Sequence, residues 1–299
     1  MCAYRRICLT LFALVTGLGP VVPASGQGTD QALANATSFA RIDVTTTADG
    51  VEEPRALQMA IVSYRPVGGS VKGLQVDLIG AVHIGDQEYY AELNRRFETY
   101  DALLFELVAA DGATVPQSGD EQRSLLTNMQ LGMRAVLGLK FQLDEIDYSA
   151  PNFVHADLSP SEFRQSMRDR DESPYVYFWR AFYAGMREAR KDPLGIRDLT
   201  ALSTLLFSDD PAAMKTTLAY EMTDIGQVSE MLDGPDGSAV IEARNQRAVD
   251  VLEREINAGA RHIGVFYGVA HMPDLQQRLA DQLGLTAAGT QWVDAWRLR

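Results

Sequence analysis

The sequence predicts an α/β fold, with a mixed, partly parallel sheet built from both chain ends and a large mainly helical insertion between them. Three observations support this prediction. Apolar, strand-like runs are concentrated near the two ends of the chain, at 56–66, 71–83, 101–110, 261–271 and 290–298. Segments with a helical spacing of apolar residues separate these runs, as expected for β-α-β units. The middle of the chain, 119–235, has a mainly helical pattern apart from the strand-like stretch "NFVHADL".

The first 26 residues have the organisation of a secretory signal peptide. Arg5 and Arg6 form a short basic start, an apolar run follows, and Ala24-Ser25-Gly26 places small residues ahead of a cleavage site. The apolar run is short for a bilayer crossing, which makes an uncleaved anchor the less favoured alternative. We therefore expect cleavage after Gly26 and export to the periplasm or the extracellular space. No transmembrane segment is expected after that cleavage.

Composition excludes several classes of function. Cleavage removes both cysteines, Cys2 and Cys8, together with two arginines, and it changes the net charge from −13 to −15. A chain without thiols has no disulfide framework, no thiolate nucleophile and no cysteine-ligated zinc. The acidic balance argues against nucleic acid and against anionic lipid as partners. Oligomeric state is left open by the sequence.

The mature chain is predicted to form one domain. Residues 27–55 are predicted to be a flexible N-terminal segment, and 56–299 a single domain that contains the helical insertion 119–235. The runs 56–66 and 71–83 flank "VGGS", which is typical of a hairpin. A helix is expected after Asp86, its predicted N-cap. The run "DALLFELVAA" that follows is expected to be a strand buried on both faces, so that 73–110 forms a β-α-β unit with two neighbouring parallel strands.

The second half of the chain repeats this alternation. "SPSEF" has the pattern of a capping box between Ser159 and Glu162. A helix is predicted over 238–258 and is closed by Gly259. It is followed by a strand at 261–271, a helix at 272–284 and a last, more exposed strand at 290–298.

Two of the four histidines occupy matching positions. His83 and His271 each follow a strand-like run and each lie three residues after a glycine, Gly80 and Gly268. Ligands of open α/β sheets collect at the carboxyl ends of strands, and glycine permits a close backbone approach. The alternative is that each histidine only makes a hydrogen bond at a strand end. The matching contexts favour a shared site in which the imidazoles ligate a metal or act as a general base.

Glu106 is a carboxylate among apolar neighbours in "LLFELV". An unpaired buried carboxylate is costly, so Glu106 is expected to meet a cation, a hydrogen-bond cluster or a metal. The alternative is a structural pair with an arginine. Arg244 and Asn245 form a second polar group beside an apolar helix stripe, and Arg244 could reach the carboxylate or a substrate oxygen.

Three further residues are predicted to contact a substrate: Tyr89, His155 and Trp179. His155 is adjacent to Asp157, a plausible partner for its ring. Trp179 belongs to an aromatic helix face with Tyr175, Phe178, Phe182 and Tyr183. That face is either part of the core or the wall of a substrate groove.

Together, the two Gly-x-x-His motifs, Glu106 and the Arg244-Asn245 pair resemble the TraB/GumN/Tiki family. This family belongs to a superfamily that also contains erythromycin esterases and ChaN-like haem-binding proteins. The resemblance runs from about 57 to 299 in motif order and is dense at 75–110 and 238–285. The chain departs from Tiki proteins because it has no membrane anchor and because its middle segment matches nothing in that pattern.

The resemblance implies a divalent-metal-dependent hydrolase, since Tiki proteins are membrane-tethered metallopeptidases. It implies His83, His271 and Glu106 as ligands of Mn, Co or Zn, with Glu106, Arg244 and Asn245 as catalytic residues. The substrate would be a peptide or a small-molecule ester or amide. Two alternatives stay open: a metal-free, esterase-like hydrolase in which one histidine acts as a general base, and a non-enzymatic haem- or metal-binding protein of the cell envelope.

Overall fold

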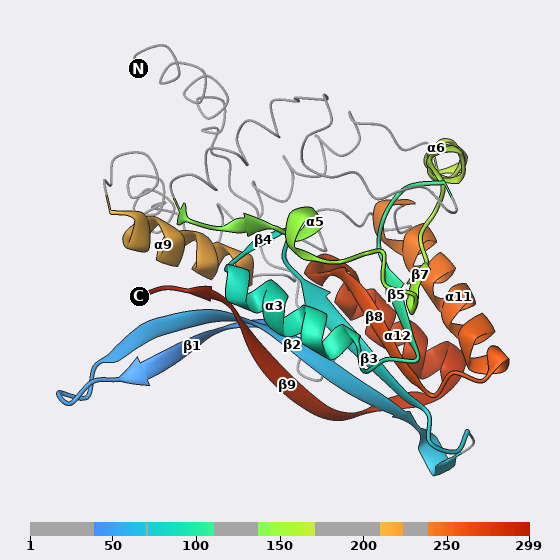
Figure 1. The fold of residues 1–299 in the computed structure, drawn as a ribbon, viewed down its shortest axis with the longest axis horizontal. Helices are drawn as coiled ribbons and strands as arrows, with labels where there is room; N and C mark the ends of the chain where they lie inside the picture. The colour runs from blue at the N-terminus through green and yellow to red at the C-terminus, as the bar shows by residue number, and fades with distance from the viewer. Residues whose placement is uncertain (1–38, 70, 111–136, 171–209, 224–238) are drawn as a thin grey trace, which may run out of the picture.

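The computed structural model describes residues 39–69, 71–110, 137–170, 210–223 and 239–299, and it confirms the α/β fold (Figure 1). The strands are β1 (Ala40–Thr46), β2 (Glu52–Pro66), β3 (Gln75–Ala81), β4 (Ile84–Gly85), β5 (Ala102–Phe105), β6 (Lys140–Phe141), β7 (Phe153–His155), β8 (His262–Gly268) and β9 (Leu285–Arg297). The helices are α3 (Gln87–Phe97), α5 (Gln142–Glu145), α6 (Pro160–Asp169), α9 (Pro211–Thr223), α11 (Arg244–Ala258) and α12 (Met272–Leu283). Short turns of 3-10 helix, η2 (Val67–Gly69) and η4 (Val269–His271), follow β2 and β8, and a π-helix (Ala239–Ala243) leads into α11.

One mixed sheet of seven strands organises the described part of the chain. Its strand order is β1-β2-β3-β8-β5-β7, and β9 also pairs with the long strand β2. Strands β3, β8, β5 and β7 pair in parallel, whereas β1, β2 and β9 pair antiparallel. The sheet therefore combines N-terminal strands with β8 and β9 from the C-terminal third, as the sequence predicts. The predicted hairpin is the antiparallel pair of β2 and β3.

The parallel strands are buried on both faces. Every residue of β3 after Gln75 is buried, and so are all residues of β5 and the five central residues of β8. Consecutive side chains of a strand point to opposite faces. Accordingly, the ring of Phe266 lies 4.9 Å from that of Phe97 in α3, while the next ring, Tyr267, lies 5.3 Å from His271 at the start of α12. The helices α3 and α12 thus cover opposite faces of the sheet.

Strand order differs from the prediction in one respect. The strands β3 and β5 of the predicted β-α-β unit are not neighbours, because β8 lies between them and pairs with both. The second strand of the unit also ends at Phe105, so Glu106 lies just beyond the strand and not inside it. The apolar run "LVAA" after Glu106 made the strand appear longer in the sequence.

One prediction about the segments around the sheet needs correction. Residues 40–46 and 52–55 of the segment predicted to be flexible are β-strands, in which β-branched residues of β1 pair with β2. The described parts of the insertion, 137–170 and 210–223, contain α5, α6 and α9, the strand β7 predicted at "NFVHADL", and the two-residue strand β6. The capping box of Ser159 and Glu162 forms as predicted. Gly259 adopts the left-handed conformation at the end of α11, with φ of 111°.

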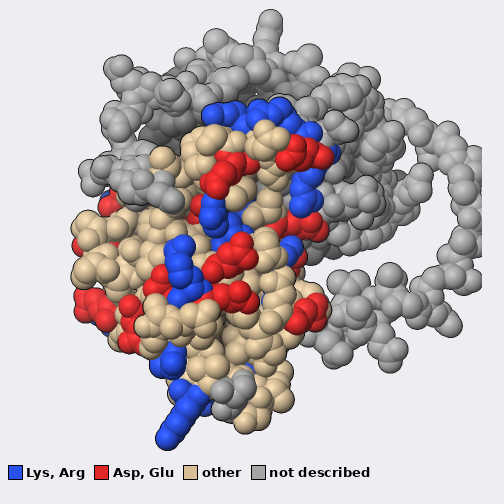
Figure 2. Space-filling model, turned by 90° about the vertical axis from the view of Figure 1, so that its right-hand side faces the viewer, with Lys and Arg blue, Asp and Glu red and all other residues tan. Residues whose placement is uncertain are grey.

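Charges on the side of the molecule that carries α6 and α11 are mixed in sign (Figure 2). Arg247 of α11 pairs with Glu162 of α6, Arg170 pairs with Glu242, and Arg278 pairs with Asp274 within α12. The first two pairs connect α6 to the helix that carries Arg244. Within the described ranges, no helix is both long enough and apolar enough to span a membrane.

Candidate functional site

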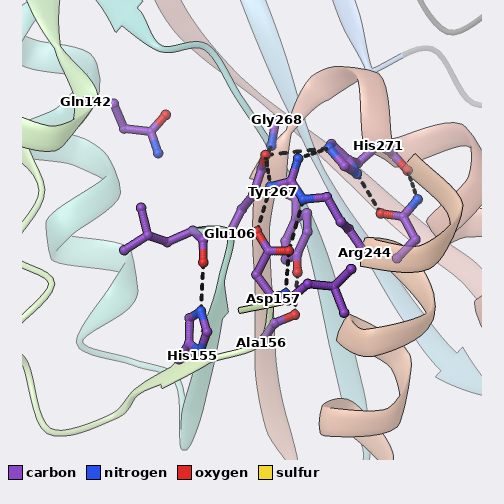
Figure 3. A network of polar contacts seen from close by, with 12 residues as sticks. Glu106, Gln142, His155, Ala156, Asp157, Arg244, Tyr267, Gly268 and His271 are labelled. Carbon is purple, nitrogen blue, oxygen red and sulfur yellow. Dashed lines mark hydrogen bonds and ion pairs between the residues drawn. The ribbon is translucent and has the colours of Figure 1, made fainter. Parts of the chain in front are cut away.

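The predicted site residues converge at the carboxyl ends of the parallel strands. His83 follows β3, Glu106 follows β5, and His271 follows β8 after one turn of 3-10 helix. Asp157 follows β7 in the same way. Because these four strands run in the same direction, their carboxyl ends lie at one edge of the sheet, where ligands of α/β proteins bind. Arg244 reaches this edge from the first turn of α11 (Figure 3). Asn245 is the next residue of that turn.

Both predicted glycines are required by close packing at this edge. A Cβ atom on Gly80 would lie 3.3 Å from Cγ2 of Val269, so the first motif packs directly against the second. A Cβ atom on Gly268 would lie 3.2 Å from Oε2 of Glu106, 3.9 Å from Cδ2 of His271 and 4.0 Å from Nε2 of His83. The structure therefore brings His83, Glu106 and His271 together around Gly268.

Arg244 connects the acidic groups of the site. Its Nη2 atom donates to Oε1 of Glu106 at 2.6 Å and to Oδ2 of Asp157 at 2.6 Å, and its Nε atom donates to Oδ1 of Asp157 at 2.9 Å. Its Nη1 atom lies 3.5 Å from Nε2 of His271. Burial alone would lower the pKa of Arg244, but the hydrogen bonds to Asp157 and the charge of Glu106 outweigh burial and raise it. The guanidinium is therefore a fixed positive charge in the site.

Glu106 is ionised although its side chain is only 15% exposed. Its Oε2 atom accepts a 2.6 Å hydrogen bond from the backbone amide of Gly268, and its Oε1 atom lies 3.5 Å from Nε2 of His271. Burial would raise the pKa of Glu106. The contact with His271, the charge of Arg244 and the Gly268 amide together outweigh burial and hold that pKa well below its ordinary value.

Asn245 fixes the orientation of the His271 ring. Its Nδ2 atom lies 3.1 Å from the carbonyl oxygen of His271 and 2.8 Å from Oδ2 of Asp274, and both of these oxygens can only accept a hydrogen bond. The amide oxygen must therefore face the ring, and it lies 2.7 Å from Nδ1 of His271. An amide oxygen accepts, so Nδ1 carries a hydrogen. Nε2 faces Glu106 and Arg244: it donates to Glu106 when the ring is protonated and carries the lone pair when the ring is neutral.

A second layer holds Asn245 in turn. The Nε atom of Arg278 donates to Oδ2 of Asp274 at 2.6 Å. The same oxygen accepts from Asn245. Asn245 itself is fully buried. Asn245 thus orients His271 and contacts it from the side of Nδ1, away from Glu106.

His83 differs from His271 in its exposure. Its side chain is exposed, whereas His271 is only 4% exposed. The backbone carbonyl of His83 accepts a 2.9 Å hydrogen bond from the amide of Gln142, which fixes the His83 turn to the start of α5. A substrate would therefore reach the site from the side of His83, with His271 as the deeper group.

The described residues show no preformed site for the expected divalent metal. Among the residues with described coordinates, no group of three or more His, Cys, Asp or Glu side chains is arranged to hold a metal ion. Both oxygens of Glu106 accept hydrogen bonds, one from Arg244 and one from Gly268. The guanidinium of Arg244 thus supplies a positive charge next to Glu106 and His271.

The prediction that Tyr89 contacts a substrate is wrong. Tyr89 is 1% exposed, and its hydroxyl donates to the carbonyl oxygen of Gly80 at 3.2 Å, so it packs beneath the first motif and supports it from the core. Desolvation by burial raises its pKa. The helix α3 turns the side chain of Tyr89 into the core.

His155 takes a local structural role. Its Nε2 atom lies 2.7 Å from the carbonyl oxygen of Leu107, which fixes the segment after Glu106 to β7. The predicted pairing of His155 with Asp157 is also wrong, because the carboxylate of Asp157 is bound by Arg244. Trp179 and the rest of the aromatic helix face lie outside the described residues.

Sequence reasoning missed two carboxylates that the structure places in the hydrogen-bond network of the site, Asp157 and Asp274. A buried aspartate directly after a strand, as in "FVHAD", signals a strand-end carboxylate, and this signal could have identified Asp157 as the partner of Arg244. Asp274 is the third residue of α12 and gave no signal beyond that of an ordinary first-turn carboxylate.

Comparisons with protein-family models, with curated proteins and with solved structures found no match.

Proposed function

We propose that this protein is an exported hydrolase that cleaves a carbonyl compound, an ester or an amide, with His271 as the general base. One observation carries the proposal: the His271 ring is held by Asn245 so that its Nε2 atom points toward Glu106 and Arg244. A base whose orientation is fixed by a third group is the arrangement that acid–base catalysis requires. The exposed His83 at the same strand edge supports an opening for the substrate.

The proposed reaction uses only side chains of this chain. Nε2 of His271 takes a proton from a water molecule while the water oxygen attacks the carbonyl carbon. Glu106, 3.5 Å away, stabilises the imidazolium that forms. Negative charge develops on the carbonyl oxygen, and the guanidinium of Arg244 and the exposed ring of His83 are the groups available to stabilise it. His271 then returns the proton to the leaving oxygen or nitrogen.

A metal-dependent reaction at the same residues is the alternative that the family resemblance favours. It would place a second cation beside Glu106, whose Oε1 atom accepts from Arg244 at 2.6 Å. Removal of metal separates the two alternatives, because only the metal-dependent reaction would stop when a chelator is present.

The proposal is tested by hydrolysis of chromogenic esters and amides, for example p-nitrophenyl esters and peptide p-nitroanilides. Wild-type protein is expected to cleave members of the panel, and His271→Gln to be at least about 100-fold slower, as is typical for loss of a general base. His262→Gln is the matched control and is expected to retain activity, since His262 lies at the first residue of β8, at the opposite end of that strand from His271. Equal rates for wild type and His271→Gln would refute the proposal.

A further inference from the structure

Gln142 carries a polar atom that the fold leaves without a partner. Its side chain is 8% exposed, and its Nε2 atom donates to the hydroxyl of Tyr148 at 2.8 Å. Its Oε1 atom is buried and has no hydrogen-bond partner among the described residues, and it is the single side-chain atom of this kind there. Buried acceptors are almost always satisfied, so an orphaned one calls for an explanation.

Gln142 is connected to two residues at the candidate site. Gln142 is the first residue of α5, and its backbone amide donates to the carbonyl oxygen of His83. Its partner Tyr148 lies against Phe105, the residue before Glu106, with ring centroids 5.3 Å apart. In Figure 3, Gln142 and His271 lie on opposite sides of Glu106, and the amide end of Gln142 points toward Glu106.

Electrostatics also connect Tyr148 to the site. Burial raises the pKa of Tyr148 to about 12, and the negative charge of Glu106 contributes to the increase. Tyr148 is therefore a neutral hydroxyl that faces the amide of Gln142. Its contact with Nε2 leaves the amide oxygen as the unsatisfied atom.

We infer that Gln142 is a substrate-recognition residue whose Oε1 atom accepts a hydrogen bond from an N–H group of the substrate. This inference rests on the proposed function and narrows it to substrates with an N–H near the cleaved carbonyl, that is, to amides and peptides over simple esters. A site built to bind a polar hydrogen discriminates strongly against an analogue that lacks it, because the buried acceptor then remains unpaired. The orphaned oxygen is that acceptor.

The test compares substrates that differ in one hydrogen. N-acetylated tripeptide p-nitroanilides are paired with counterparts in which one peptide nitrogen carries a methyl group. Binding is measured by the increase in melting temperature and hydrolysis by the release of p-nitroaniline. Wild-type protein is expected to prefer one N–H substrate over its N-methyl counterpart at least about tenfold in kcat/KM. In Gln142→Met this ratio is expected to fall close to one.

Two further variants keep the comparison interpretable. Gln142→Glu preserves the shape of the side chain and an acceptor oxygen, and it is expected to retain part of the preference if Gln142→Met folds poorly. Gln282→Met removes an exposed glutamine at the end of α12, and it is expected to match the wild type in melting temperature and preference.

The outcomes separate this inference from the proposed function. Hydrolysis with a preference that does not depend on Gln142 overturns the inference and leaves the hydrolase proposal standing. Binding with a Gln142-dependent preference but no hydrolysis supports the inference and overturns the hydrolase proposal. If the amide of Gln142 turned over to present its NH2 group, a substrate carbonyl would be recognised and N-methylation would not matter, which also overturns the inference.

Discussion

Nδ1 of His271 lies 2.7 Å from Oδ1 of Asn245, and this contact determines which ring nitrogen faces the carboxylate of Glu106. The orientation of the Asn245 amide is not arbitrary, because its Nδ2 atom contacts two oxygens that can only accept. A residue on α11 thereby sets the tautomer of a histidine that follows β8. The first prediction concerns this pair.

Replacing Asn245 with leucine leaves Nδ1–H of His271 unpaired and frees the ring to change tautomer. Hydrolysis is expected to fall about 10- to 100-fold in kcat, the range found when the group that orients a histidine is lost. NMR of ¹⁵N-labelled histidine checks the cause directly, because four rings are readily distinguished. The wild type should show His271 with hydrogen on Nδ1. Asn257→Leu, on the exposed side of α11, is the control and should change neither property. A wild-type ring with hydrogen on Nε2 would refute this orientation.

Replacing Glu106 with glutamine is expected to lower the free energy of unfolding by about 1–3 kcal/mol at neutral pH. The cost stays below the roughly 3–5 kcal/mol of a fully stranded buried charge, because Arg244 keeps both contacts with Asp157. The measurement is urea unfolding, with the exposed Glu253→Gln as the control. If Glu106→Gln lowered the free energy of unfolding by more than about 3 kcal/mol, Glu106 would be mainly structural.

The same pair predicts the pH dependence of stability. Because the pKa of Glu106 in the folded protein lies below its ordinary value of 4.5, the unfolded chain binds the proton more readily. The stability that ionised Glu106 contributes is complete above about pH 4.5 and is lost as the pH falls below that value. Between about pH 4.5 and 2, the free energy of unfolding should therefore fall less steeply in Glu106→Gln than in the wild type. Parallel curves would contradict the assignment.

Replacing Gly268 with alanine tests the close approach of Glu106 to the strand end. The new Cβ atom would lie 3.2 Å from Oε2 of Glu106, which has no flexible end that could yield without breaking the bond to the Gly268 amide. We expect a loss of about 1–3 kcal/mol in the free energy of unfolding and a marked loss of hydrolysis. Gly289→Ala is the matched control, since a Cβ atom there meets nothing within 4 Å. Equal behaviour of the two variants would show that Glu106 is not held at Gly268.

The sequence allowed the main site residues to be identified because each has a local signature. A glycine three residues before a histidine at a strand end, and a carboxylate next to a buried strand, can be recognised without knowing the strand order. Arg244 and Asn245 were recognised in the same way, as polar residues beside an apolar stripe. The glycines proved necessary for contacts that the sequence does not specify, namely Gly80 with Val269 and Gly268 with Glu106.

What the sequence could not predict depends on tertiary partners. The insertion of β8 between β3 and β5 follows from pairing across more than 150 residues, which no local pattern encodes. The choice of Arg244 as the partner of Asp157, in preference to the adjacent His155, depends on where α11 docks. Tyr89 was misassigned for the same reason, because only the packing of α3 decides which side of the helix is buried.

Export is predicted by the first 26 residues, which lie outside the described part of the chain. Protein recovered from the cell envelope or from the medium should begin at Gln27 on N-terminal sequencing. Mature protein that begins at Met1 and is found in the cytosol would contradict this prediction.

The central claim, that His271 oriented by Asn245 activates water without a metal, is tested most directly by rates measured after metal removal. Wild type and His271→Gln are dialysed against a chelator, their metal content is checked by elemental analysis, and hydrolysis of the ester and amide panel is measured. The account predicts that metal-free wild type retains its rate, and that His271→Gln is at least about 100-fold slower at an unchanged melting temperature. Wild-type activity that disappears on chelation and returns with Mn, Co or Zn would contradict the account and support the metal-dependent alternative.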